Sequence, residues 1–396
     1  MTNRDVVVVS YARTPFGKLG GALKGFRAPE LGGIAIKAAL EKISLDPKLV
    51  DYAYIGQVLQ GGVGQQPARQ ATIAAGLSWE TPAILVNKVC SSGIIAVLQG
   101  FMRIKLGMSD VVVAGGMESM TNAPYFLPDE RWGARMGDKK VKDLMMHDGL
   151  WCPFYDRHMA VHGSEVSAEY EISRQSQDEF ALRSQRLATE AMDKGLLKGQ
   201  ITPVEVKDRK GNVSLVELDE SPRRDASLEQ MAKLPPVFSK EGSVTAGNAP
   251  GVNDGAAALV LMSREKAEKL GLEILATIID YAEVSQEAKY IATVPGLSTK
   301  KLLEKNNLTT DDIAFFEVNE AFAAVALVSQ KIAGFDLNKT NVYGGAVAFG
   351  HPIGATGARI VMNLIEVLKD HEGGYGVAAI CSGAAQGDAL LLKVEK

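Results

Sequence analysis

The stretch "LVNKVCSSGIIAV", residues 85–97, holds a cysteine that can act as a nucleophile. Cys90 stands between two apolar runs and is followed by Ser91, Ser92 and Gly93. A cysteine placed between a strand and a helix that begins near Ser91 would face the unpaired N–H groups of that helix. These groups favour thiolate over thiol, and the small residues leave room for a carbonyl group. A buried structural cysteine is the alternative at this point.

A second loop, "GGAVAFGHPIGATGAR" at residues 344–359, carries a histidine. Pro352 fixes its own φ and restricts His351 to an extended backbone, so the imidazole is held in one direction. The glycines around it allow close approach of a ligand, but their spacing fits neither a dinucleotide fingerprint nor a Walker loop. A loop histidine with an ordinary hydrogen bond is the competing interpretation.

Two further loops add a second thiol and an amide. Cys381 opens "CSGAAQG" after an apolar run, and Asn319 follows a similar run in "EVNEAF". Asn319 alone could be a turn residue. Together the four loops supply what acyl transfer to carbon requires. One thiolate accepts the acyl group, a second base removes a proton, and hydrogen-bond donors hold each oxyanion.

Composition indicates a globular enzyme of two or three packed units. The 396 residues are 46% hydrophobic and 23% charged, and the net charge of −4 does not indicate a nucleic-acid surface. The cysteines at 90, 152 and 381 lack metal-ligand spacing, which points to a reducing compartment. The run of four valines near the start is too short for a signal peptide or a membrane span. We therefore expect a cytoplasmic protein with no membrane association.

Strands covered on both faces are expected to alternate with helices in an α/β architecture. The charged helix of residues 173–195 is expected to end at Gly195. The expected strands are Val6–Val9, Val111–Val113, Ala257–Met262, Ala314–Val318 and Val377–Cys381, and the other expected helices span residues 30–42, 91–106 and 298–305.

The chain shows a weak internal repeat. "LEKISLDPKLVDYAYIG" at residues 40–56 aligns with "LEKNNLTTDDIAFFEVN" at 303–319, and both predict a helix end, a polar turn and a strand. Each half also ends in a strand that leads to a cysteine among small residues. Residues 121–250 are instead charged and glycine-punctuated, which favours an insertion carried by the first half.

Seven motifs now place the chain beside a known family, and they occur in family order along nearly the whole sequence. The chain resembles the thiolases, above all the acetoacetyl-CoA (biosynthetic) thiolases. The motifs are "RTPFGKLGG", "NKVCSSG", "VAGGMESMTNAPY", "VTAGNAPGVNDGAA", "VNEAF", "GGAVAFGHPIGATGAR" and "CSGAAQG". The resemblance implies a five-layered αβαβα fold made of two duplicated halves. Residues 1–120 with 251–270 would form the first half, residues 271–396 the second, and 121–250 an inserted loop domain that binds coenzyme A and makes oligomer contacts.

The resemblance also implies a role for each residue of the four loops. Cys90 would be acetylated, and His351 would take its proton. Cys381 would be the base that acts on the methyl group of the second acetyl-CoA. Asn319 would hold a water that stabilises the enolate oxygen together with His351. The backbone N–H groups of Cys90 and Gly383 would form the second oxyanion hole. No metal or redox cofactor is expected.

Other positions match the coenzyme A-binding residues of the family. Three features depart from the family pattern. Pro250 puts one hydrogen bond to coenzyme A in doubt, and His162 and the loop "CSGAAQG" could change the chain-length range or the rate. The matching positions are His158 and Met159 along the pantetheine path, Arg223 near the nucleotide, and Phe238, Ala246 and Phe322 as tunnel walls.

The activity implied is the reversible condensation of two acetyl-CoA molecules to acetoacetyl-CoA and coenzyme A. A 3-ketoacyl-CoA thiolase with a broader chain-length range is the near alternative. A non-catalytic acyl-CoA-binding relative and a ketoacyl synthase-like enzyme are further ones. The family implies a homotetramer or homodimer, with the charged segment "RMGDKKVKD" as a tetramer contact or a solvated loop.

Overall fold

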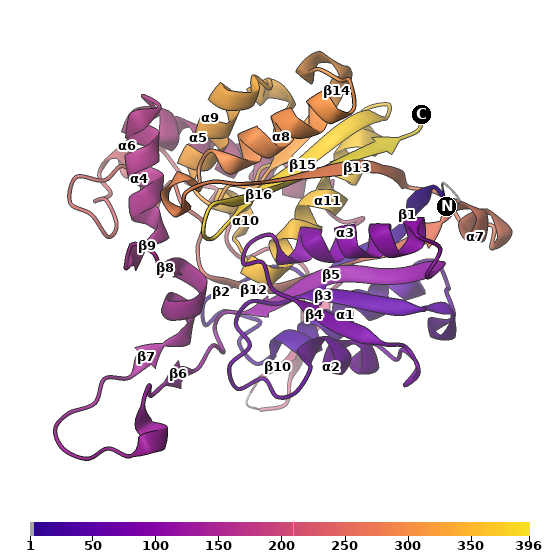
Figure 1. The fold of residues 1–396 in the computed structure, drawn as a ribbon, viewed down its shortest axis with the longest axis horizontal. Helices are drawn as coiled ribbons and strands as arrows, with labels where there is room; N and C mark the ends of the chain where they lie inside the picture. Colours follow the sequence, from indigo (N-terminus) through magenta and orange to yellow (C-terminus); the bar gives the residue numbers. More distant parts are fainter. Residues whose placement is uncertain (1–3, 209) are drawn as a thin grey trace.

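The computed structural model describes residues 4–208 and 210–396 as two α/β halves with the same strand pattern (Figure 1). The strand order is β4-β3-β5-β12-β1 in the first half and β14-β15-β16-β13 in the second. In both halves the strands at the edge away from the junction pair in parallel, and the strands nearer the junction pair antiparallel. The first half contains β1 (Val6–Arg13), β3 (Tyr52–Gly56), β4 (Ala83–Val86), β5 (Val111–Ser119) and β12 (Asn253–Ser263), and the second contains β13 (Ala276–Ser285), β14 (Ile313–Val318), β15 (Gly374–Ser382) and β16 (Gln386–Val394).

The two halves share one sheet, because residues 6–8 of β1 pair antiparallel with residues 276–278 of β13. A short strand β2 (Gly17–Lys18) pairs with β12 and completes a ten-stranded sheet. The sequence predicted two duplicated halves. The structure shows in addition a seam between them, which is the short stretch of backbone hydrogen bonds that pairs β1 with β13. The seam fixes how the cysteine loops of the two halves face each other.

Helices form the other three layers, which confirms the predicted five-layered arrangement. α3 (Ser92–Lys105) and α11 (Ile353–Asp370) lie together between the sheets of the two halves. α11 is buried along nearly its whole length, and its buried polar residues Arg359 and Asn363 both face Glu317. The outer layers are α1 (Ala28–Glu41) and α2 (Pro67–Ala74) on the first half, and α8 (Val294–Lys305) and α9 (Ala323–Ala333) on the second.

The repeat read from the sequence is confirmed in the structure. In the first half α1 is followed by a 3-10 turn (Pro47–Leu49) and then β3, and in the second half α8 is followed by a 3-10 turn (Thr310–Asp312) and then β14. α8 begins four residues earlier than predicted, since Pro295 is accommodated in its first turn, where the missing N–H costs no hydrogen bond.

The segment between β5 and β12 leaves the sheet and forms its own small elements. Its longest helix ends as predicted, with Gly195 at φ +70° directly after the cap residue. Residues 127–141 project from the body as an extended tongue, at the lower left of Figure 1. The segment contains β6 (Tyr125–Phe126), β7 (Lys142–Asp143), β8 (Trp151–Cys152), β9 (Arg157–His158), α4 (Met159–Glu169), α5 (Arg174–Asp193), β10 (Val204–Lys207), β11 (Val213–Val216) and α6 (Leu228–Ala232), with a 3-10 turn (Glu130–Trp132) and a π-helical turn (Met145–Leu150).

Short elements complete the fold around the central layers. Across residues 4–208 and 210–396, no helix is both long enough and apolar enough to cross a membrane. The remaining elements are α7 (Arg264–Lys269), α10 (Ala346–Phe349) and two 3-10 turns (Ala288–Tyr290 and Leu337–Lys339).

Candidate active site

Cys90 lies in a tight turn between β4 and α3. The residue before it, Val89, has φ +45°, which is rare for a β-branched side chain and marks strained backbone. Ser92 braces the turn: its hydroxyl donates to the Val89 carbonyl at 2.6 Å and accepts the Lys88 N–H at 2.9 Å. The cysteine is therefore fixed just ahead of the helix, as the sequence predicted.

The second cysteine lies at the end of β15, and its loop meets the Cys90 turn. Cys381 is fully buried, and the hydroxyl of Ser382 donates to the Lys88 carbonyl. The backbone N–H of Gly383 lies close enough to the Cys90 sulfur to lower the pKa of that thiol. The two cysteine loops, which are almost 300 residues apart in the sequence, are therefore in direct contact.

His351 is held in a single tautomer by its neighbours. Its backbone N–H donates to Asn253 Oδ1 at 3.0 Å, and its Nδ1 lies 2.7 Å from the Thr356 hydroxyl. That hydroxyl donates its own proton to the Pro352 carbonyl at 2.9 Å, so it must accept from the imidazole. Nδ1 therefore carries the proton. Nε2 is buried without a hydrogen-bond partner among the residues that the structure describes, so it presents a free lone pair.

A buried carboxylate anchors the loop that carries His351. Glu118, at the end of β5, accepts the backbone N–H groups of Val58, Leu59 and Gly354 at 2.9–3.1 Å. Gly116 lies so close to this loop that an added Cβ would stand 1.9 Å from the Gly354 carbonyl oxygen. Strand β5 and the histidine loop are thus in backbone contact.

Asn319 follows β14 and has the environment of a site residue. It is fully buried, and within residues 4–208 and 210–396 neither its side-chain oxygen nor its side-chain nitrogen has a hydrogen-bond partner. Its backbone N–H donates to the Ala379 carbonyl at 2.9 Å, on the strand that ends at Cys381. The next residue, Glu320, accepts hydrogen bonds from Ser184 and from the side chain of Asn341. An unpaired buried amide is costly, so this one is expected to meet water or substrate.

Burial sets the protonation states of the resting site. It raises the pKa of the Cys90 thiol to about 12, against the backbone N–H groups of Cys90 and Gly383, which lower it. It also raises the pKa of the Cys381 thiol well above its usual value, and the neighbouring Cys90 adds to that rise. Burial, helped by the Arg359 charge, lowers the pKa of His351 to about 3. Neutral imidazole beside neutral thiol is the starting state for general base catalysis.

Cys90, His351 and Gly383 line an apolar cavity of about 300 Å³. Cys381 and Asn319 are fully buried and are not among the residues that line this cavity. Of the predicted coenzyme A-binding residues, the cavity includes His158, Met159, Phe238, Ala246 and Phe322, and it also includes Pro250 and several residues that the sequence reasoning did not single out, among them Met120, Met145 and Ile291.

His158 and Phe238 form a stacked pair in the cavity wall. Their ring centroids are 3.6 Å apart and their planes differ by 9°. His158 Nδ1 accepts the Ala160 N–H at 3.1 Å, and burial lowers its pKa to about 4, so the ring is neutral with its proton on Nε2. Phe238 has φ +61° and is 57% exposed. A flat apolar wall that reaches solvent suits an extended chain such as pantetheine.

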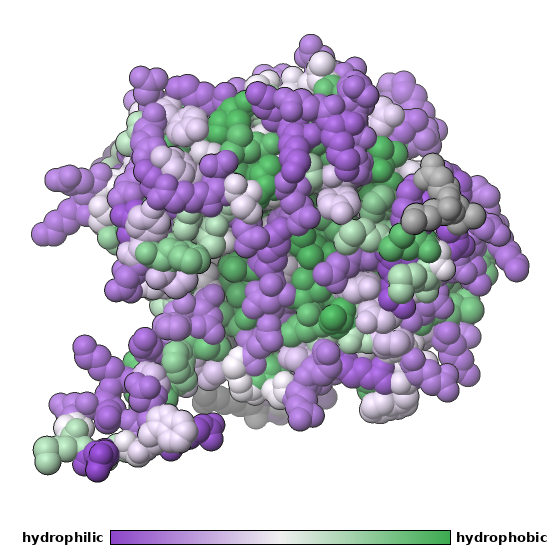
Figure 2. Space-filling view, in the orientation of Figure 1, coloured by the Kyte–Doolittle hydropathy of each residue, from purple (hydrophilic) through white to green (hydrophobic). Residues whose placement is uncertain are grey.

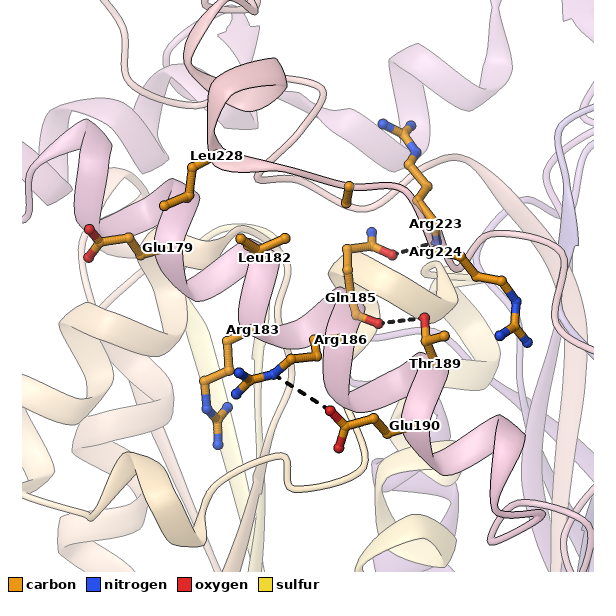
Figure 3. Close-up of a pocket in the computed structure, with 11 residues that line it drawn as sticks. Glu179, Leu182, Arg183, Gln185, Arg186, Thr189, Glu190, Arg223, Arg224 and Leu228 are labelled. Atoms are coloured by element: carbon orange, nitrogen blue, oxygen red, sulfur yellow. Dashed lines mark hydrogen bonds and ion pairs between the residues drawn. The ribbon is translucent and has the colours of Figure 1, made fainter.

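Arg223 does not line the apolar cavity. It lies beside a separate groove of about 470 Å³ along α5, where Arg183, Arg186 and Arg224 are its cationic neighbours. In Figure 3 the Arg223 side chain points away from α5, while its backbone N–H donates to Gln185 at 2.7 Å. Its predicted contact with the nucleotide stays a prediction.

Sequence reasoning missed the residues that orient the reacting groups. Thr356, Asn253 and Glu118 touch His351 or its loop through hydrogen bonds. Thr356 stands five residues after His351 and one helical turn after Pro352. A helix expected to begin at Pro352 could therefore have indicated that Thr356 lies near His351. Over the described part of the chain, no group of three His, Cys, Asp or Glu side chains is arranged to hold a metal ion.

This arrangement is suited to an enzyme that transfers acyl groups through a cysteine thioester. It offers a thiol at a strained turn, a neutral histidine with a free nitrogen, a second buried thiol and backbone donors. The chain belongs to the thiolase family. The family models "Thiolase, N-terminal domain" and "Thiolase, C-terminal domain" match residues 6–265 and 272–394.

Relatives of similar length share its sequence and fold. The acetyl-CoA acetyltransferase of Cupriavidus necator is 46% identical over 98% of this chain and 99% of its own. Acetyl-CoA acetyltransferase 1 of Arabidopsis thaliana is 44% identical over 98% of this chain and 94% of its own. The crystal structure of the Bacillus anthracis acetyl-CoA acetyltransferase superimposes with a TM-score of 0.96 at 39% identity, covering 99% of both chains.

Proposed function

We propose that the protein is an acetyl-CoA C-acetyltransferase that condenses two acetyl-CoA molecules reversibly to acetoacetyl-CoA and coenzyme A. One observation carries the proposal: Cys90, His351 and Gly383 line one apolar cavity, and Cys381 is buried near enough to Cys90 for the two thiols to influence each other. The relatives named above, which match this chain from end to end, support the same activity.

In the first half-reaction the Cys90 sulfur attacks the thioester carbonyl of acetyl-CoA, and His351 Nε2 takes the thiol proton. The carbon–sulfur bond to coenzyme A then breaks, and the departing thiolate receives that proton. His351 is suited to this exchange because Thr356 holds its other nitrogen protonated. The product is acetyl-Cys90 and free coenzyme A.

In the second half-reaction Cys381 first gives its thiol proton to His351 Nε2, and the thiolate then removes a proton from the methyl group of a second acetyl-CoA. The carbanion attacks the carbonyl of acetyl-Cys90, and the bond from that carbon to sulfur breaks to give acetoacetyl-CoA and the Cys90 thiolate, which takes the proton back from His351. We assign the enolate oxygen to His351 and a water on Asn319, and the oxygen of the acetyl-enzyme to the N–H groups of Cys90 and Gly383. Burial raises the pKa of both thiols, so each is a strong base once its proton has been removed.

The test is coenzyme A-dependent cleavage of acetoacetyl-CoA, compared with a longer 3-ketoacyl-CoA. Cleavage of the four-carbon substrate alone supports the proposal, and comparable cleavage of both moves the protein to the broader degradative class. Cys90→Ala and Cys381→Ala should each abolish cleavage, while only Cys381→Ala should still accept acetyl from radiolabelled acetyl-CoA. Full activity of either variant would refute the two-thiol mechanism.

We propose residues 121–250 as the domain that binds coenzyme A and makes oligomer contacts, between the first half (1–120 with 251–270) and the second (271–396). The location of His158 and Phe238 in this segment, on the cavity wall, supports the first role. The assignment of Arg223 to the nucleotide end belongs to the same proposal. Acetyl-CoA, acetoacetyl-CoA and coenzyme A are then its substrates and products.

We propose a homotetramer or homodimer. Two exposed surfaces support it: the tongue, with Trp132 82% and Met136 93% exposed, and edge strand β4, where Ile84 is exposed. Figure 2 shows apolar residues gathered over α3 and β4, while the tongue is mostly hydrophilic. A molar mass in solution equal to one chain would refute both assemblies. The unpaired cysteines support the cytoplasm as the proposed location.

A further inference from the structure

A buried ion pair joins the two cysteine loops, and neither half could form it alone. Lys88, two residues before Cys90, places its Nζ 2.6 Å from Asp388 Oδ1 and 2.8 Å from Glu283 Oε1. Asp388 is fully buried, whereas the Glu283 side chain is 49% exposed. The lysine comes from the first half and both carboxylates from the second.

The position of Asp388 in the sheet explains why the lysine is required. Asp388 on β16 lies opposite Glu283 on β13 and opposite Ile380 on β15, the residue before Cys381. Like charges directly opposite each other on neighbouring strands repel. Lys88 Nζ donates hydrogen bonds to both carboxylates, so its positive charge relieves this repulsion. The two negative charges of the second half thus attract the lysine and hold the Cys90 turn that carries it.

The backbone on either side of the pair leads straight to the reacting groups. Ser382 donates to the Lys88 carbonyl, and the next N–H, that of Gly383, acts on the Cys90 sulfur. Ser91, next to Cys90, has a buried hydroxyl that lies near the Asp388 carboxylate without a direct hydrogen bond. A shift of Lys88 would therefore move the Cys90 turn relative to Cys381 and Gly383.

We propose that Lys88 and Asp388 are positioning residues that set the separation between the Cys90 sulfur and the loop carrying Cys381 and Gly383. The pair acts by geometry: it holds the strained turn at Val89 against the end of β15. Its effect on turnover rests on the proposed thiolase reaction, but its effect on the Cys90 thiol does not.

The first measurement is steady-state thiolysis by Lys88→Met and Asp388→Asn, with Glu283→Gln and Lys88→Arg as matched controls. Lys88→Met and Asp388→Asn should each lose about ten- to hundredfold in kcat, which corresponds to an increase of roughly 1.4–2.7 kcal/mol in the activation barrier. Their KM for coenzyme A should stay within threefold, because the pair does not line the apolar cavity. The controls should stay within threefold in kcat, since each keeps the Lys88–Asp388 contact.

The second measurement needs no turnover: the rate of Cys90 alkylation by iodoacetamide, scored by mass spectrometry, between pH 7 and pH 10. Through its charge alone, Lys88→Met would slow alkylation and Asp388→Asn would speed it. Displacement of the Gly383 N–H predicts that both variants are alkylated about five- to tenfold more slowly than the wild type. Lys88→Arg and Glu283→Gln should match the wild type.

The outcomes distinguish the positioning role of the ion pair from an electrostatic role, and they separate both from the proposed function. Slower alkylation in both variants supports the positioning role even if the wild type does not cleave acetoacetyl-CoA, a result that would refute only the proposed function. Opposite effects on alkylation would show an electrostatic role and overturn the inference. Folded variants with kcat and alkylation within twofold of wild type would overturn it as well. If Lys88→Met does not fold, as judged by circular dichroism, Asp388→Asn alone decides, because its amide fills the space of the buried carboxylate but lacks the charge that holds Lys88.

Discussion

Replacing Thr356 with valine should disable His351 without touching the substrate cavity. Valine matches threonine in shape, but it cannot accept the proton of His351 Nδ1, which now lies 2.7 Å from the hydroxyl. That buried N–H would lose its only protein acceptor, at a cost of about 1–3 kcal/mol. The imidazole can avoid this cost by moving its proton to Nε2, and the tautomer so formed cannot deprotonate Cys90.

The expected loss follows from that free energy. At about 1.4 kcal/mol per factor of ten, thiolysis of acetoacetyl-CoA by Thr356→Val should be slower by roughly 5- to 150-fold in kcat. KM for coenzyme A should change little, since Thr356 does not line the cavity. Burial lowers the pKa of His351 to about 3, so the ring is neutral from pH 6 to pH 8 and the loss should be constant over that range.

The assay has an internal control and a clear refutation. Thr356→Ser keeps the hydroxyl and should retain at least a third of wild-type kcat. Acetylation of Cys90 by radiolabelled acetyl-CoA in a single turnover should slow in Thr356→Val by the same factor as thiolysis. A Thr356→Val protein with kcat within twofold of wild type would show that the hydroxyl does not set the tautomer.

Three further outcomes follow from the structure. Burial and the Arg157 charge lower the pKa of His162 to about 4, so the fold loses stability as pH falls from 6.5 towards 4; in urea titrations His162→Gln should reduce that loss by up to about 1.4 kcal/mol per pH unit. Ala384→Gly should be neutral or stabilising by up to about 1 kcal/mol in the same titrations, because Ala384 has φ +62°, and a loss above 1 kcal/mol would contradict strain there. Gly116→Ala should displace the loop at Gly354 and lower kcat at least tenfold, and normal thiolysis would disprove that close contact.

Much of the fold was predictable because its signals are local. Apolar runs with polar boundaries placed β1, β5, β12, β14 and β15 but did not identify β13 and β16, and helical spacing placed α1, α3 and α8 to within a few residues. The repeat at residues 40–56 and 303–319 identified the duplication, since both copies keep the same helix, turn and strand. The seam between β1 and β13 was not predictable, because any of several apolar edges could have paired there.

The candidate site divides in the same way. Cys90, His351, Cys381 and Asn319 stand in distinctive loops, so residue type and neighbours sufficed to single them out. Thr356 and Asp388 look ordinary in the sequence, and only the fold brings one beside an imidazole and the other beside Lys88. Arg223 shows the opposite case, in which a matching motif does not bring the side chain to the cavity lining.

The central helix α11 has a consequence for how the chain is made. It packs against β5 and β12 of the first half, yet it spans Ile353–Asp370, close to the end of the chain. A ribosome adds about 5–20 residues per second, so roughly a hundred residues separate the completion of β12 from that of α11 by about 5–20 s. During this interval the nascent first half exposes the part of its apolar sheet face, beside α3, that α11 will cover. Chains that terminate before Ile353 should therefore be captured by chaperones or aggregate, and the two halves should become soluble fragments only when they are synthesised together.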